Sequence, residues 1–158
     1  MTTRVTVAGH PIHAMLVTLP VGLWVFSLAS DIVYASTGDS RWEFTAYCTL
    51  GGGVIGALLA AVPGFIDLLG LHEARERHTG IAHMVINLLI VALQIINFWL
   101  RGRYDVGPQA PMLLSVVAVA ALFVSGWLGG QLVHVLGVTQ PHHGEPHPVD
   151  VDRLHPRT

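Results

Sequence analysis

The sequence has no lysine, a single cysteine and few charged residues of either sign. Only 11% of its 158 residues are charged, whereas 52% are hydrophobic, and a soluble domain cannot cover that much apolar surface with so few charges. The formal net charge is −2 and no basic run occurs, which argues against nucleic acid as a partner. The lone Cys48 excludes a disulfide framework. The composition therefore indicates an integral membrane protein.

The common catalytic signatures are also missing. The sequence contains no G-x-S-x-G elbow, no phosphate-cradling glycine loop and no H-E-x-x-H pair. We therefore expect a redox carrier or a binding subunit rather than a stand-alone enzyme.

Four apolar runs are each long enough to cross a bilayer, which takes about 20 residues of helix. The predicted spans are residues 11–35, 44–69, 80–100 and 111–136. They predict an all-α fold, an integral membrane antiparallel four-helix bundle over residues 1–138. Residues 139–158 form a tail rich in proline and histidine. Four spans put both termini on one side of the membrane, and Arg153 and Arg157 in the tail favour the cytoplasmic side.

Histidines gather at the end of the bundle that carries the termini. Pro11 suits the first turn of a helix, so His10 and His13 are expected three residues apart on one helical face. His83 begins the third span, and Asp67 near the end of the second span adds a carboxylate at the same end. Ionisable residues inside spans are functional candidates by default.

Polar residues also follow one face of the third span. They are His83, Asn87, Gln94 and Asn97, and at 100° per residue they fit within an arc of roughly 80°. Polar groups are costly against lipid, so this row should face the bundle interior and form hydrogen bonds between helices. Asp31, at the opposite end, is expected to pair with Arg41 or a helix-end group.

Several short stretches together resemble one known family. They are the run from His10 to Leu16, Asp31, the segment from Gly64 to Asp67, His83 with Asn87, and the run from Ser125 to Gly130. The pattern resembles the bacterial membrane family called domain of unknown function 2231, over roughly residues 9 to 138. The resemblance implies a multi-pass protein of the bacterial inner membrane. Some members of that family are fused to a Rieske-type iron–sulfur domain, which hints at electron transfer, but the family has no settled activity.

The first interpretation of the histidine end is a b-type haem. A haem between helices needs imidazoles from different helices, small residues that admit a flat ring, and cations near the propionates. His13 and His83 are the expected axial ligands, with His10 as the alternative. The expected cofactor-binding residues around them are Gly64, Gly126, Gly130, Arg75 and Arg77. A redox protein or a quinone would then be the partner, and the glycine-rich faces would also suit a homodimer.

The second interpretation is a single ion of zinc, iron or copper. Its ligands would be His10, His13, His83 and Asp67. A third interpretation is a structural partner subunit without a cofactor. The tail histidines, which are His142, His143, His147 and His155, are candidates for copper or nickel but are more often simply solvated.

Overall fold

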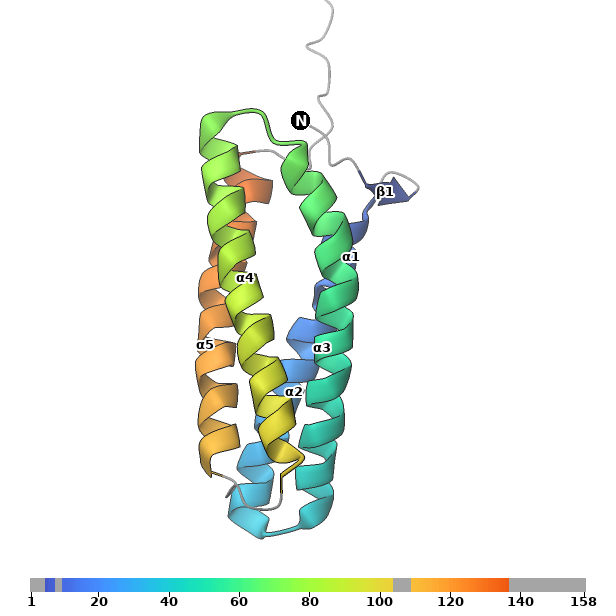
Figure 1. Ribbon diagram of the computed structural model, residues 1–158, viewed down its shortest axis with the longest axis vertical. Helices are drawn as coiled ribbons and strands as arrows, with labels where there is room; N and C mark the ends of the chain where they lie inside the picture. Colours follow the sequence, from blue (N-terminus) through green and yellow to red (C-terminus); the bar gives the residue numbers. More distant parts are fainter. Residues whose placement is uncertain (1–4, 8–9, 104–108, 137–158) are drawn as a thin grey trace, which may run out of the picture.

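The computed structural model describes residues 5–7, 10–103 and 109–136. Within them, long helices run antiparallel as a bundle (Figure 1). The elements are β1 (Thr6–Val7), β2 (His10–Pro11), α1 (Ile12–Leu16), α2 (Thr18–Thr37), α3 (Ser40–Leu69), α4 (Ala74–Arg101), α5 (Gln109–Gly130) and the π-helical turn η1 (Gln131–Val135). Four stretches of the described chain are long and apolar enough to cross a membrane: Ile12–Thr37, Ser40–Leu69, Ala74–Arg101 and Gln109–Val135.

The bundle is apolar outside and partly polar inside. Large apolar side chains such as Ile55, Leu89 and Phe123 are more than half exposed. The buried set instead includes Asp31, Gln94 and several serines. This inversion suits a bundle whose outer surface faces lipid, because polar groups are satisfied inside and apolar groups are free to face the hydrocarbon. The predicted all-α membrane fold is confirmed.

The first span begins differently from the expectation. His10 and Pro11 form β2, which pairs antiparallel with β1 through Val7 opposite His10. Pro11 has extended backbone angles and caps α1, so the helix begins only at Ile12. The prediction that His10 and His13 share a helical face is therefore wrong. Pro20, which has no N–H for the carbonyl of Leu16, accounts for the break between α1 and α2.

Two neighbouring residues explain why α2 ends and α3 begins where they do. Gly38 ends α2 with a φ of +69°, a left-handed conformation that favours glycine. Asp39 caps α3 by accepting a hydrogen bond from the backbone N–H of Arg41.

Helix α4 begins at Ala74, six residues before the predicted start at residue 80. Arg75 and Arg77 therefore lie in its first turns rather than in a loop, because a helix can continue through charged residues once it leaves the hydrocarbon.

One apolar layer divides the interior of the bundle into two polar regions. Trp24, Leu50, Ile90 and Ala118 are buried against one another, and the indole N–H of Trp24 donates to the carbonyl of Leu50 over 3.2 Å. On α4, Asn87 lies on one side of Ile90 and Gln94 on the other. The polar row predicted along the third span is thus interrupted at its centre.

Candidate functional site

Two of the predicted ligands meet at the end of the bundle that carries the N-terminal segment. The ring centroids of His13 on α1 and His83 on α4 are 6.3 Å apart, and the ring planes are nearly perpendicular at 89°. Both side chains are partly buried. Two helices that are far apart in the sequence therefore bring their imidazoles into edge-on contact.

The ring of His13 is held against one turn of α3. Its Nδ1 lies 2.9 Å from the carbonyl oxygen of Ala60. Four residues later stands Gly64, where an added Cβ would lie only 2.6 Å from that same Nδ1. Pro63 lies between them and has no N–H for the helical ladder, so this turn of α3 is less tightly bonded than its neighbours. His13 can approach the backbone because no side chain intervenes.

The ring of His83 is held in the same way against α5. Its Nδ1 lies 3.0 Å from the carbonyl oxygen of Ser125, and an added Cβ on Gly129 would lie 3.2 Å from its Cε1. We call this arrangement, a carbonyl with a glycine four residues later, a carbonyl–glycine seat. The two seats are Ala60 with Gly64 and Ser125 with Gly129. Each half of the bundle supplies one histidine and one seat.

Asn87 fixes His83 further. Its Nδ2 donates to the backbone oxygen of His83 over 2.8 Å and to the Oγ of Ser125 over 2.7 Å. The same nitrogen lies 3.2 Å from the Nε2 of His83. An amide has only two hydrogens, and the two shorter bonds account for both. The predicted hydrogen bonds between α4 and α5 are therefore present at Asn87.

The seats also define the tautomer of both histidines. A carbonyl oxygen only accepts, so the Nδ1 of each ring carries a hydrogen, and in the neutral form of the ring Nε2 carries the lone pair. A Nδ1–H bonded to a backbone carbonyl is a common support of metal-binding histidines in general.

The other predicted ligands do not join this pair. His10 is exposed on β2, and the Oδ1 of Asp67 accepts the N–H of Val5 over 3.1 Å. Within the described ranges, no three His, Cys, Asp or Glu side chains are grouped closely enough to hold a metal ion. Arg75 and Arg77 are exposed in the first turns of α4. The tail histidines lie outside the described residues.

The three predicted glycines have different surroundings. Gly64 touches His13, whereas an added Cβ on Gly126 or Gly130 would have no other atom within 4 Å. Gly126 and Gly130 instead line an apolar groove of about 580 Å³ between α2, α5 and η1, with His134 at its edge. They do not border the two rings. Gly129, which the sequence also offered as a small residue that leaves room for the group, is the glycine of α5 that borders a ring.

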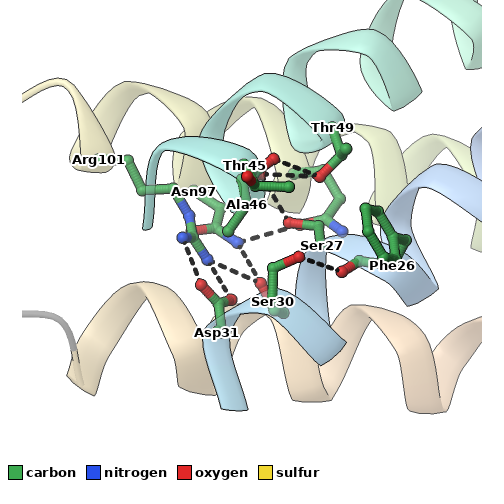
Figure 2. A network of polar contacts seen from close by, with 11 residues as sticks. Phe26, Ser27, Ser30, Asp31, Thr45, Ala46, Thr49, Asn97 and Arg101 are labelled. Atoms are coloured by element: carbon green, nitrogen blue, oxygen red, sulfur yellow. Dashed lines mark hydrogen bonds and ion pairs between the residues drawn. The ribbon is translucent and has the colours of Figure 1, made fainter. Parts of the chain in front are cut away.

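A second polar cluster lies at the opposite end of the bundle (Figure 2). The guanidinium of Arg101 donates to both carboxylate oxygens of Asp31, with Nη1 to Oδ1 at 2.7 Å, and both side chains are less than 10% exposed. Arg101 also donates to the Oδ1 of Asn97 and to the Oγ of Ser115. The prediction that Asp31 pairs with Arg41 is wrong. Arg101, the last residue of α4, is buried beside Asp31, whereas Arg41 is exposed at the surface.

Serines that were not among the predicted residues complete this cluster. Ser27 donates to the carbonyl of Ala46 and Ser30 to that of Phe26, each over 2.8 Å (Figure 2). Asn97 donates to Ser115 over 2.9 Å, which is the interhelical bond that the polar row predicted. Their spacing could have predicted the serines of α2, because Ser27, Ser30 and Asp31 fall on one face of that helix. The Nε2 of Gln94 is buried and has no partner among the described residues.

Arg41 has a partner of its own on the surface. Its Nη2 lies 2.7 Å from the Oδ2 of Asp39 in the connection between α2 and α3. The hydrogen bonds from the side chain and the backbone N–H of Arg41 lower the pKa of the Asp39 carboxyl. This pair is exposed and makes no contact with the buried cluster.

A family model described as "Predicted membrane protein (DUF2231)" matches residues 9–141. No curated protein and no solved structure matches the chain. The matched segment includes both histidines, both carbonyl–glycine seats and the buried pair of Asp31 and Arg101. The chain belongs to this family of membrane proteins of unknown function.

Proposed function

We propose that this protein is a membrane-embedded electron-transfer protein that holds a b-type haem through His13 and His83. One observation carries the proposal. The ring centroids of two imidazoles from different helices lie 6.3 Å apart, and the Nδ1 of each ring is hydrogen-bonded to a backbone carbonyl oxygen. Bound haem would supply a one-electron couple inside the bilayer.

The two rings would be the ligands of the haem iron, since imidazole nitrogen is a usual protein ligand of that metal. They come from different helices, and their centroids are 6.3 Å apart. In the neutral form of each ring, Nδ1 donates to a carbonyl and Nε2 keeps the lone pair that the iron would take.

The chain's own residues orient the ligands. The seats at Gly64 and Gly129 fix the rotation of each ring, and Asn87 donates to the backbone oxygen of His83 and to the Oγ of Ser125. Hydrogen bonds behind a ligand set its tautomer and its basicity. Arg75 and Arg77 stand at the same end of the bundle and are the cations suited to the propionates.

The second candidate is a membrane protein that binds a single zinc, iron or copper ion. The edge-on contact of the two rings favours it, because an ion needs less room between helices than a porphyrin. His10 and Asp67 would be the additional ligands. Asp67 accepts the N–H of Val5, so this site requires the N-terminal segment to move.

The protein's surroundings follow from the same proposal. We infer a location in the bacterial inner membrane with the terminus-bearing end facing the cytoplasm. The partner would be a redox protein or a quinone. The exposed Gly126 and Gly130 would suit the interface of a homodimer.

The first experiment is an absorption spectrum of the detergent-purified protein, oxidised and then reduced, with metal analysis on the same sample. A Soret band that sharpens on reduction, with split visible bands, would support haem. A colourless protein with stoichiometric zinc, iron or copper would instead support the ion. If the protein binds neither when both are supplied, the proposal is wrong and the histidine pair is structural.

Variants then assign the ligands. His13→Ala and His83→Ala should each abolish the bound haem or lower the metal content several-fold. His72→Ala is the matched control, since His72 is exposed at the same end. Unchanged cofactor content in both ligand variants would contradict the assignment.

A further inference from the structure

A cavity of about 440 Å³ opens at the end of the bundle opposite the histidine pair. The ends of α2, α3, α4 and α5 all contribute to its walls. Its lining residues lie within two turns of a helix end, or about 10 Å. Since the helices span the hydrocarbon, this is the depth of lipid headgroups and of the first acyl carbons.

Two oppositely charged groups in the cavity wall have no ion-pair partner among the described residues. Its floor includes Asp31 and Arg101, which neutralise each other. The remaining charges are the carboxylate of Glu43 in the first turn of α3 and the guanidinium of Arg103 just after α4. In the part of the chain that the structure describes, neither Glu43 nor Arg103 forms an ion pair. The cavity thus offers one anion and one cation to a ligand.

Arg103 is held in position by stacking. Its guanidinium carbon lies 4.0 Å from the ring centroid of Trp99. Stacking on an aromatic face occupies the plane of a guanidinium but leaves its N–H edges free, and those edges match the geometry of a phosphate. Arg103 is therefore oriented for an anion at the membrane surface.

The rest of the wall suits an amphipathic molecule. Phenol groups come from Tyr34 and Tyr47, and apolar surface comes from Phe44, Pro111 and Met112. A small polar head with an apolar continuation would contact both kinds of group. The volume falls within the usual range of small-molecule sites, about 300 to 1,000 Å³.

We propose that this cavity binds the headgroup of a phosphatidylethanolamine-type lipid, with the phosphate on Arg103 and the ammonium on Glu43. A primary ammonium donates hydrogen bonds to a carboxylate, which a quaternary choline cannot do. A glycerol headgroup would place only neutral hydroxyls beside Glu43, so the carboxylate would have no counter-charge. This lipid site is independent of the histidine pair and of the haem proposal.

The test is lipid binding to the full-length protein in detergent, followed by native mass spectrometry. Dioleoyl lipids with ethanolamine, choline or glycerol headgroups are added separately. The ethanolamine lipid should bind about fivefold more tightly than the other two, the value expected for one exposed ion pair of up to about 1 kcal/mol. Equal binding, or tighter binding of the glycerol lipid, would overturn the proposal.

Two variants separate the two contacts. Glu43→Gln should remove the preference for ethanolamine, and Arg103→Gln should weaken binding of all three lipids about fivefold. Arg41→Gln is the matched control, because Arg41 is an exposed arginine at the same end that pairs with Asp39 and does not line the cavity. Both charges are on exposed side chains, so circular dichroism should show unchanged helix content. Wild-type binding in both cavity variants would overturn the assignment.

A soluble headgroup distinguishes a lipid from a free solute. Phosphoethanolamine without acyl chains should compete only at concentrations far above those of the lipid, because the apolar wall is left empty. If it binds as tightly as the lipid, the ligand is a soluble phosphate ester and the lipid proposal is wrong.

Discussion

The two polar regions of the bundle hold their side chains by opposite means. At the histidine end, two rings are each held by one backbone carbonyl and the glycine four residues later. At the opposite end, Arg101 donates to Asp31, Asn97 and Ser115, and the charges cancel inside the protein. The first region relies on backbone atoms and small residues, whereas the second relies on an ion pair and on side-chain hydrogen bonds between helices. The apolar layer around Ile90 keeps them separate.

The largest effect should come from breaking the ion pair. Asp31→Ala leaves the guanidinium of Arg101 buried without its counter-charge. Removing one partner of a buried pair should lower the free energy of unfolding by about 3–5 kcal/mol. Thermal and denaturant unfolding in detergent would measure this loss. The double substitution Asp31→Leu with Arg101→Leu should be less harmful than Asp31→Ala, because no buried charge remains.

Asp39→Ala is the control for the removal of an aspartate at the same end of the bundle. It removes an exposed partner, so its effect on the midpoint of unfolding should be much smaller. If Asp31→Ala were as mild as this control, the buried pair would not be the main stabilising element of that end.

The next effect tests the seats. Gly64→Ala would place a Cβ 2.6 Å from the Nδ1 of His13, so the ring must leave the carbonyl of Ala60. Overpacking of this kind costs about 1–3 kcal/mol, and cofactor content should fall as the ring moves. Absorption spectra and unfolding curves of the same preparation would report both changes.

Gly126→Ala is the matched control, because it adds the same methyl group at a position of α5 that has free space around it. Its added Cβ would meet no other atom within 4 Å, so the better helix propensity of alanine should leave the protein as stable as before or slightly more so. Equal cofactor loss in the two glycine variants would argue that the seat of Ala60 and Gly64 does not position a ligand.

A smaller effect is expected at Asn87. Asn87→Ala removes its bonds to the backbone of His83 and to Ser125, and interhelical hydrogen bonds in membranes are worth about 0.6–2 kcal/mol. His83 keeps its carbonyl, so cofactor content should persist while the reduction potential or metal affinity shifts. A variant that loses the cofactor entirely would make Asn87 essential to the seat rather than a support of it.

The smallest effect should be at the surface pair and should depend on pH. Arg41 lowers the pKa of Asp39 in the folded protein, so the pair stabilises the fold above the usual aspartate pKa of about 3.9. That contribution is lost as the pH falls through the lowered folded value. Asp39→Asn keeps a capping side chain and removes the charge.

The midpoints of unfolding of Asp39→Asn and the wild type should therefore differ slightly at pH 7 and converge in acid. A difference that grows as the pH falls would contradict the assigned sign.

The four-helix fold and the pairing of His13 with His83 could be predicted from the sequence. They depend on hydropathy and on which helical face a side chain occupies. Four apolar runs predicted the bundle, and the position of His83 on the inner face of its helix predicted that it would meet His13. The partner of Asp31 was not accessible. Arg41 and Arg101 both lie at the correct end, and only the packing of the folded helices decides which of them is buried beside Asp31.

The seats were not accessible for a different reason. Their essential atoms are backbone carbonyls, which every residue has, and the glycines were predicted only as small residues that leave room. The histidine-to-carbonyl separations are 47 residues in one half and 42 in the other, so no repeat of fixed period marks them in the sequence. His10 was misplaced because the backbone at Pro11 is extended, and a proline suits either a first helical turn or a strand end.

The duplicated seat has an architectural consequence. One hairpin, with a histidine on its first helix and a carbonyl and glycine on its second, contains half of the centre. The other hairpin repeats this arrangement, so each half of the described bundle brings the same kind of surface to the middle. The described bundle is therefore organised like a dimer within one chain, with the connection between α3 and α4 joining its halves.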